Sequence, residues 1–398
     1  MIKLIGFKIY GHSLFEDGTT FSIQTQNKVT KKTENRVVKF NDSLSLNKTI
    51  GLVGINATGK STLMRIFSGL NDLYLFEESV EQTDLNKAFR SQNGSIKVEA
   101  YFASENNRAF KAETVFKEQS GEKNKREWVI DSEKIYNKQT KSSSKSKYFE
   151  FKNKNYFDRK DLSTQAKNMV KPNDSVFIGS LKNENIITNN ERRSIVLSTV
   201  EFTDVNVPRT FADQTPKELL EYLDPSIEYL KYKRDDDGKI INCKLKFKYN
   251  ESVIEKSSFN EITQYLSSGT IKGITLFFEF IMALRMGATL LVDEIELHIN
   301  KQIARDFIGL FTDPDINIKK STLIYSTHYI ELTDDLVRND EEYILKRDKL
   351  SKLVRLSSKI DRNDFTKSDI FQNNILGGTA PSYNRLQKLK KSIKHNMG

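Results

Sequence analysis

Residues 54–61 bring together the residue types that bind phosphate. They read GINATGKS and fit the pattern G-x-x-x-x-G-K-[ST]. Glycines allow the backbone to curl so that consecutive N–H groups face one anion, and the lysine adds a positive charge for the outer phosphates. The serine hydroxyl is a ligand for Mg²⁺. The segment therefore predicts a nucleotide site formed by Gly54, Asn56, Ala57, Thr58, Gly59, Lys60 and Ser61.

The residues on either side of this loop predict the elements that hold it. The apolar run at residues 49–53 indicates a buried strand, and residues 61–67 indicate a helix. A strand, a glycine loop and a helix are the context in which this pattern binds phosphate, because the helix directs its positive end at the anion. An ordinary glycine-rich turn is the alternative interpretation, and the context disfavours it.

A pair of carboxylates follows a second apolar run. Leu290, Leu291 and Val292 precede Asp293 and Glu294. A buried strand of a parallel sheet delivers such residues to the sheet edge where ligands bind. We expect Asp293 to hold Mg²⁺ through its water shell and Glu294 to orient and deprotonate the attacking water, the division that phosphate hydrolysis requires. Many strands end in acidic residues, so the pair indicates a phosphate-hydrolysis site only in combination with the glycine loop upstream.

Two further segments place polar residues at the ends of predicted elements. Residues 321–328 indicate a strand that ends at His328, which is placed to hydrogen-bond a terminal phosphate, although a lone histidine is more often structural. Residues 266–270 read LSSGT and precede an apolar helix at 274–286. A serine and a glycine at a helix N-terminus form either a second anion site or an ordinary N-cap. A second nest would crowd the first on the same phosphates, so its simplest use is to complete the site of a second molecule.

Composition limits the class of protein. The chain has 398 residues, enough for two or three lobes, with 37% hydrophobic and 29% charged residues. Its net charge of +10 and pI of about 9.2 permit binding to nucleic acid or another acidic partner without establishing it. No apolar run approaches the about 20 residues of a membrane span, and the N-terminus is too short and polar for a signal peptide.

The single cysteine, Cys243, excludes a disulfide framework within the chain. This suits a reducing compartment, so we expect a cytoplasmic protein. Cys243 alternates with Ile241 and Leu245, which predicts a small core residue on a strand rather than a catalytic thiol.

The order of predicted elements indicates an α/β fold with a mixed sheet, an accessory antiparallel β lobe and a helical insertion. Residues 2–10 and 95–102 alternate as strands, and residues 109–116 and 127–130 are expected to be antiparallel partners of residues 95–102. Residues 70–87 and most of 161–235 suggest helices, and residues 238–256 suggest a hairpin. We expect three regions: an N-terminal ATPase lobe at 1–130, a basic and mainly helical insertion at 131–262, and a C-terminal ATPase lobe at 263–398. No heptad series supports a long coiled coil.

A basic stretch lies within the insertion. Residues 138–147 are rich in lysine and serine and suggest an exposed loop. Residues 148–160 alternate aromatic side chains with lysine and arginine. This mixture is typical of a nucleic-acid-binding face, and the alternative is an element that packs its aromatic rings inward.

The segments GINATGKST, LSSGT, LLVDEIELHIN and IYSTHY, in that order, resemble the ABC-type ATPase family. The resemblance is greatest to the soluble branch that contains the overcoming-lysogenization-defect ATPases, the RecF-like proteins and the ATPase subunits of anti-phage systems of the PARIS, Septu and AbiL types. It extends to the segments LDPSI at 223–227, LVRND at 336–340 and LGGTAP at 376–381.

This resemblance implies a role for each residue of the nucleotide site. Lys60, Ser61 and Thr62 would bind the phosphates of ATP, with Ser61 as a ligand of Mg²⁺. Asp293 would support the metal, and Glu294 would be the catalytic base.

The resemblance also implies a dimer. Ser268 and Gly269 would contact the γ-phosphate of ATP held by a partner subunit, and His328 would act as the switch histidine. The working unit would be a head-to-head homodimer, or a larger homo-oligomer, with ATP at the interface.

Three features depart from the family pattern. The signature reads LSSGT rather than LSGGQ. The glutamine of the Q-loop has only Gln82 and Gln92 as candidates, and the residue that stacks on adenine has only Phe15. These departures are compatible with slow ATP turnover.

The function that we expect is an ATP-driven switch or scaffold in bacterial anti-phage defence, acting with a separate effector protein such as a nuclease or toxin. About 70 residues follow His328, which is too few for an appended nuclease domain of roughly 100 residues. The alternative is a RecF-like DNA-repair ATPase, with nucleic acid as the partner. A transporter subunit and a nuclease are less favoured, and the run of acids at 235–237 resembles a turn more than a metal centre.

Overall fold

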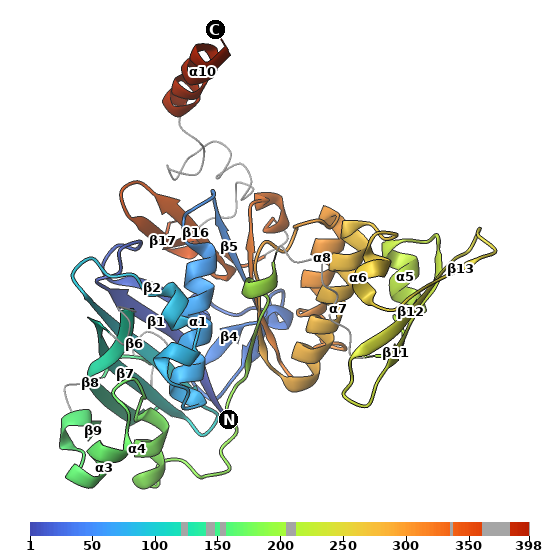
Figure 1. The fold of residues 1–398 in the computed structure, drawn as a ribbon. Helices are drawn as coiled ribbons and strands as arrows, with labels where there is room; N and C mark the ends of the chain where they lie inside the picture. Colours follow the sequence, from blue (N-terminus) through green and yellow to red (C-terminus); the bar gives the residue numbers. More distant parts are fainter. Residues whose placement is uncertain are drawn as a thin grey trace.

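The computed structural model describes residues 1–120, 126–140, 148–151, 157–203, 212–334, 337–359 and 383–397. Its two largest sheets each have six strands, and a three-stranded sheet and a short hairpin accompany them. Figure 1 shows helix α1 between the antiparallel strands on the left and the parallel strands at the centre, with helices α7 and α8 on the other side of the parallel strands. The fold is α/β with a mixed sheet and an antiparallel β lobe, as the sequence predicts.

The mixed sheet forms the framework of the molecule. Its strand order is β10-β14-β15-β5-β16-β17, and all neighbours are parallel except β16 and β17. The central strands β14, β15 and β5 are buried along their whole length, as their apolar composition predicts. The strands span Val196–Ser198 (β10), Thr289–Val292 (β14), Thr322–Thr327 (β15), Thr49–Gly54 (β5), Glu342–Arg347 (β16) and Ser351–Arg355 (β17).

Alternate residues of these strands face different helices. Leu291 of β14 and Ile324 of β15 belong to the hydrophobic core that contains α1 (Lys60–Leu75). Leu290 and Leu323 belong to the core that contains α7 (Ser268–Met286) and α8 (Lys301–Leu310). The period-2 alternation of a strand therefore buries both faces of the sheet, one under each group of helices.

The antiparallel sheet packs on the opposite side of α1. Its strand order is β2-β1-β6-β7-β8-β9, and the ring of Phe21 on β2 meets that of Phe67 on α1 edge to face, with centroids 5.6 Å apart. The predicted pairing of residues 95–102 with 109–116 is confirmed, whereas residues 127–130 pair with β7 and not with residues 95–102. The strands span Thr19–Ser22 (β2), Ile2–Tyr10 (β1), Ser95–Ser104 (β6), Arg108–Ser120 (β7), Arg126–Gln139 (β8) and Phe157–Asp158 (β9).

A smaller sheet lies beyond α7 and contains the cysteine. Cys243 is buried on the middle strand, β12, which confirms the prediction of a core residue, and burial raises the pKa of its thiol to about 11. Its strands are β11 (Ile227–Arg234), β12 (Ile240–Phe247) and β13 (Val253–Lys256), flanked by helices α5 (Lys217–Leu223) and α6 (Phe259–Thr263). The remaining elements are the hairpin strands β3 (Val37–Lys39) and β4 (Ser45–Asn47) and the helices α2 (Leu85–Ala88), α3 (Thr164–Met169), α4 (Phe177–Asn183) and α10 (Tyr383–Met397).

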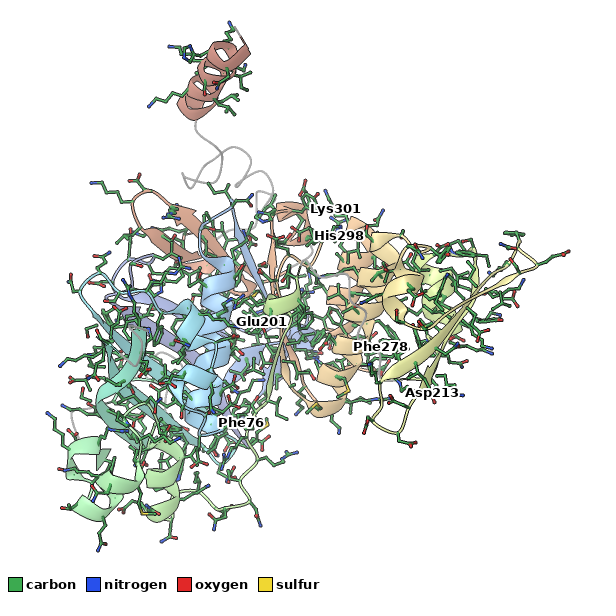
Figure 2. All side chains as sticks on the ribbon, in the orientation of Figure 1. Phe76, Glu201, Asp213, Phe278, His298 and Lys301 are labelled. Atoms are coloured by element: carbon green, nitrogen blue, oxygen red, sulfur yellow. The ribbon has the colours of Figure 1, made fainter. Side chains whose placement is uncertain are left out.

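The structure corrects two predictions of helix. Residues 70–87 do not form one helix, because α1 ends at Leu75 and Glu77 has a left-handed backbone (φ 60°) that no helix continues through. Figure 2 shows Phe76 at the end of α1, where the chain leaves the helix. The second correction concerns residues 161–235, which the sequence predicts to be mainly helical. In the described part of this range the α-helices are only the short α3, α4 and α5, while residues 196–198 form strand β10 and residues 227–234 form strand β11.

The basic stretch in the middle of the chain packs its described aromatic rings inward. Tyr148 is buried, and the ring of Phe149 lies 5.3 Å from that of Tyr101 on β6. The ring centroid of Phe151 lies 6.2 Å from that of Tyr136 on β8. The inward-packing interpretation therefore holds for residues 148–151, whereas residues 141–147 and 152–156 lie outside the described residues, as does the LGGTAP segment. Within the described parts, no helix combines the length and apolar character needed to cross a membrane.

Candidate functional site

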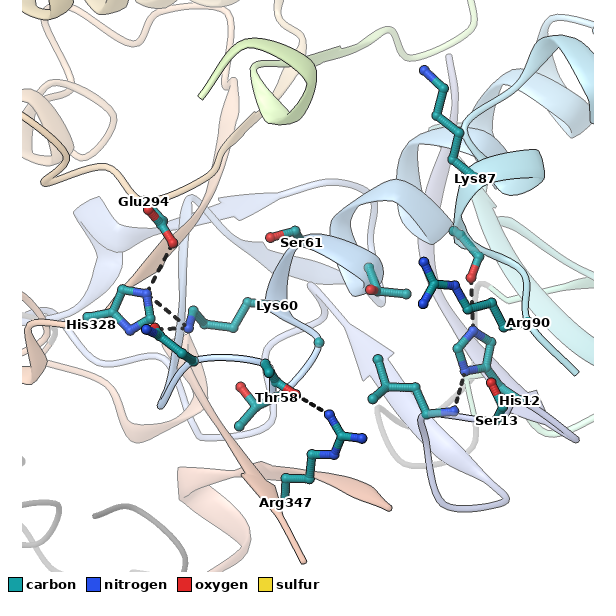
Figure 3. Close-up of a pocket in the computed structure, with 16 residues that line it drawn as sticks. His12, Ser13, Thr58, Lys60, Ser61, Lys87, Arg90, Glu294, His328 and Arg347 are labelled. Atoms are coloured by element: carbon teal, nitrogen blue, oxygen red, sulfur yellow. Dashed lines mark hydrogen bonds and ion pairs between the residues drawn. The ribbon is translucent and has the colours of Figure 1, made fainter. Parts of the chain in front are cut away.

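A pocket of about 570 Å³ opens at the carboxyl edge of the parallel sheet. Figure 3 shows that the glycine loop, Glu294 and His328 all face into it. Because these residues follow the ends of β5, β14 and β15, three neighbouring parallel strands deliver them to one place. The other residues that line the pocket are Thr62 of α1, His12, Ser13, Leu14, Lys87, Ala88, Arg90 and Arg347.

The glycine loop leaves the beginning of α1 open to this pocket. The N-cap residue, Gly59, has φ 96°, and no side chain caps the helix. A Cβ atom at Gly59 would lie 2.8 Å from Leu14 Cδ2 and 2.9 Å from Phe15 Cζ, so only glycine fits. The first backbone N–H groups of α1 have no intrahelical acceptor and face the pocket, together with the positive end of the helix dipole. This arrangement suits a phosphate group.

Lys60 lies at the floor of the pocket. Its Nζ donates to the carbonyl of Gly54 (2.8 Å) and lies 3.4 Å from each ring nitrogen of His328. Burial lowers the pKa of Lys60, and the carboxylates Asp293, Glu294 and Glu296 partly offset this effect. The structure thus places the buried ammonium of Lys60 near three carboxylates, where it can also bind a more strongly charged anion.

The two acids after β14 occupy different environments. Asp293 is 5% exposed and accepts a hydrogen bond from the hydroxyl of Ser326. Glu294 reaches the pocket from a left-handed backbone (φ 46°), and its N–H donates to the same hydroxyl over 2.8 Å. Ser326 of β15 therefore holds both acids in place: Glu294, which lines the pocket, and Asp293, which does not.

His328 connects the acid and the lysine. Its Nε2 lies 3.1 Å from Glu294 Oε1, and its backbone N–H donates to Glu296 Oε1 over 2.7 Å. In the tautomer that carries the proton on Nε2, the ring donates to Glu294 and its Nδ1 accepts from Lys60 (Figure 3). The structure therefore brings Lys60, Glu294 and His328 into one hydrogen-bonded group.

The LSSGT segment lies outside this pocket. Ser267 is the N-cap of α7, because its side chain accepts from the N–H of Thr270 over 3.0 Å. Ser268 is exposed, and a Cβ atom at Gly269 would lie 2.7 Å from the carbonyl oxygen of His298. Figure 2 shows His298 close to Lys301, where α8 begins. The N-cap interpretation accounts for Ser267, and close packing accounts for Gly269, but neither explains Ser268.

Several residues of the pocket carry no sequence signal that points to them. Arg347 lies at the end of β16 and donates to the carbonyl of Ala57 over 2.7 Å. His12 accepts at Nδ1 from the N–H of Leu14 and bonds through Nε2 to the carbonyl of Ala88, both over 3.0 Å. Burial lowers the pKa of His12, which favours a neutral ring with the proton on Nε2. Arg90 and Lys87 add positive charge on the same side of the pocket.

Three candidates from the sequence do not reach the pocket. Phe15 is 1% exposed and packs behind Gly59, so its ring is not available to stack on a base. Gln82 and Gln92 are not among the residues that line the pocket. Among the described residues, no group of three or more His, Cys, Asp or Glu side chains is arranged to hold a metal ion. One hydroxyl, from Ser61, and one carboxylate, from Asp293, fit Mg²⁺ held mainly by phosphate and water.

Comparisons with known proteins give one family. Residues 50–334 match the family model described as "AAA domain, putative AbiEii toxin, Type IV TA system". No curated protein matches the chain. A solved structure described as "Crystal structure of the SmcHead bound to the C-winged helix domain of ScpA" is 15% identical, covers 90% of this chain and 100% of its own, and has a TM-score of 0.41.

Proposed function

This chain belongs to the AAA-domain family described as putative AbiEii toxin of type IV TA systems, and on that premise we propose that it binds and hydrolyses ATP as a switch. In this proposal the chain is the switch or scaffold subunit of a bacterial anti-phage defence system. A separate effector protein, such as a nuclease or toxin, carries out the damage. The toxin–antitoxin context in the family description supports a defence role.

The observation that carries the proposal is the meeting of Lys60, Glu294 and His328 at the open end of α1. Lys60 and the N–H groups of residues 56–62 bind the phosphates. Ser61 and Asp293 would hold Mg²⁺, which would neutralise phosphate charge. Glu294 would accept the proton of the attacking water, and His328 would hold the Glu294 side chain in position through its Nε2. Asp293 is buried and does not line the pocket, which suits a metal ligand that acts through water.

The position of Ser268 supports an ATP-bridged dimer. The C-terminus of α7 adjoins β14 at the amino edge of the parallel sheet, so the N-terminus of α7 lies towards the carboxyl edge, on the side of the nucleotide pocket. Ser268 is exposed there but does not line the pocket of its own chain. We infer that Ser268 and Gly269 meet the γ-phosphate of ATP in a second subunit, with the positive end of α7 directed at it. Hydrolysis would then remove the bridging phosphate and loosen the pair.

The test is Glu294→Gln, compared with Glu331→Gln, which changes a carboxylate outside the pocket that pairs with Lys301. We expect Glu294→Gln to lower ATP turnover by a factor of about 100 or more. With ATP and Mg²⁺ it should run as a dimer in light-scattering chromatography, whereas Glu331→Gln should behave like wild type. Hydrolysis at the wild-type rate by Glu294→Gln would refute the assigned role. A negative charge introduced at Ser268, in Ser268→Glu, should prevent the dimer without unfolding the subunit.

The defence role has its own test. The trapped Glu294→Gln protein, tagged and expressed in its native host, should recover a specific effector protein, and Lys60→Met should recover less of it. Recovery of the same proteins by both variants would contradict an ATP-controlled switch. The net charge of +10 also favours a RecF-like DNA-repair ATPase as the second candidate. That function predicts DNA-stimulated hydrolysis with a steep salt dependence.

A further inference from the structure

A second pocket, of about 370 Å³, lies at the opposite edge of the parallel sheet. On one side it is lined by Gly287, which precedes β14, by Lys319 and Lys320, which precede β15, and by Thr322, the first residue of β15. On the other side it is lined by Lys3 of β1 and by residues of the β3–β4 hairpin. This is the amino edge of the sheet, whereas the nucleotide pocket lies at the carboxyl edge. The six residues of β15 separate the two by about 20 Å.

The walls of this pocket are strongly basic. Five basic side chains line it, and Glu105 is the one acid among its lining residues. The carboxylate of Glu105 is already paired with the terminal ammonium of Met1, at 2.8 Å, and lies 3.9 Å from Arg192. The pocket therefore carries a net positive charge. The basic residues are Lys3, Lys39, Arg192, Lys319 and Lys320.

Lys3 differs from the other basic residues because it is buried. It is 3% exposed, and its Nζ donates to the hydroxyl of Thr322 over 3.2 Å. An ammonium group has three N–H donors, and no carboxylate among the described residues pairs with this one. Burial lowers the pKa of Lys3 to about 8. A buried charge without a counterion is unfavourable, so at neutral pH the pocket presents a cation that an anion would stabilise.

We propose that this pocket is a second anion site, which binds a phosphoryl group through Lys3 at its centre and Arg192, Lys319 and Lys320 at its rim. Several cations around one cavity suit a group with more than one negative charge, and lysine binds phosphate as a point charge. Apolar side chains share the lining, and one of them, Ile318, is 74% exposed. They provide a surface for the part of the ligand that carries the phosphate. That part is either a small phosphorylated molecule or the backbone of a nucleic acid.

The test is carried out in the Lys60→Met variant, so that phosphate binding at the nucleotide pocket is weakened and binding at the proposed second site can be measured. Inorganic pyrophosphate and a short single-stranded DNA are titrated in turn by calorimetry into the full-length protein. In this background we expect Lys3→Met to weaken binding about tenfold or more, the loss typical of a charge-assisted hydrogen bond. The matched control is Lys8→Met, which removes a lysine from the same strand but away from the pocket.

The outcomes distinguish the source of the phosphate. Binding of pyrophosphate but not DNA identifies a small phosphorylated ligand, and tighter, Lys3-dependent binding of DNA with a steep salt dependence identifies a nucleic-acid backbone. The rim variant with Lys319→Gln and Lys320→Gln changes only exposed residues, and it should also weaken binding. The proposal is wrong if neither probe binds the Lys60→Met protein, or if Lys3→Met and the rim variant bind as well as Lys8→Met. None of these outcomes depends on ATP hydrolysis.

Discussion

The two edges of the parallel sheet each contain a buried lysine, and the two lysines have different neighbours. Lys60 is 6% exposed at the carboxyl edge, where Asp293, Glu294 and Glu296 offset the effect of its burial. Lys3 is 3% exposed at the amino edge, where burial alone shifts its pKa. Lys60 can leave these carboxylates to bind a phosphate and can interact with them again when the phosphate is released, as a cycle of binding and hydrolysis requires. No acid in the described part of the chain pairs with Lys3, which suits a site that holds its anion.

The largest expected effect comes from removing each ammonium while keeping the length of the side chain. Lys60→Met should lower ATP turnover by a factor of about 100 or more, because it deletes a preorganised charge at the phosphates. Lys3→Met should change turnover less than about twofold, since it lies at the other edge of the sheet. Steady-state phosphate release measures both. If Lys60→Met and Lys3→Met lowered ATP turnover equally, the two edges of the sheet would not have the different roles assigned to them.

The next effect concerns stability and pH. The folded-state pKa of Lys3, about 8, lies below its ordinary value of 10.5, so the unfavourable burial of the charge is fully present below pH 8. Between pH 8 and 10.5 the unfolded chain keeps the proton that the folded chain has released, so wild-type stability rises with pH in this range. Lys3→Met should therefore raise the free energy of unfolding by about 2–3 kcal/mol at pH 7.

This gain should shrink as the pH rises from 8 towards 10.5, and urea unfolding at several pH values measures it. The other charged groups around the pocket are the terminal ammonium of Met1, Lys39, Arg192, Lys319, Lys320 and Glu105, and they are the same in both proteins. Lys60→Met should give no such gain, because it leaves the neighbouring acids without their cation. A gain for Lys3→Met that does not vary with pH would show that packing, and not charge, limits stability there.

A smaller effect is expected from Arg347, which lines the nucleotide pocket at the end of β16. Its guanidinium supports the loop at Ala57, which has a left-handed backbone (φ 62°). Arg347→Ala should raise the KM for ATP about fivefold, equivalent to about 1 kcal/mol, with kcat within about twofold. Lys349→Ala, in the turn that follows the same strand, serves as the control. A fall in kcat with KM unchanged would instead place Arg347 in the chemical step.

The smallest effect concerns α7, which runs between the two edges. Ser267→Ala should lower stability by about 1 kcal/mol, because Ser267 caps the helix. Ser268→Ala should change stability by less than about 0.5 kcal/mol, because the side chain is exposed. Thermal unfolding of the two variants gives the comparison. Equal losses would mean that the two serines share the cap and would weaken the assignment of Ser268 to a partner subunit.

Much of the nucleotide site was predictable because its signals are local. The glycine spacing of residues 54–61, the acids that follow β14 and the histidine that follows β15 each lie next to a strand that is recognisable from its apolar run. Parallel strands end at one edge, so the meeting of Lys60, Glu294 and His328 follows from the strand assignments alone. The break at Glu77 was not predictable, because a glutamate with a positive φ leaves no mark in the sequence.

Residue types and spacing were enough to identify the loop that suits phosphate, the acids beside it and the buried strands that carry them, because each depends on residues close together in the chain. The packing of distant segments was needed to show that Arg347 and His12 share the nucleotide pocket, that Ser326 orients both acids, and that Lys3 lies buried beside Thr322. These contacts join residues far apart in the chain, and their energies depend on burial and on the distances between charges. Neither quantity exists until the sheets and helices have packed.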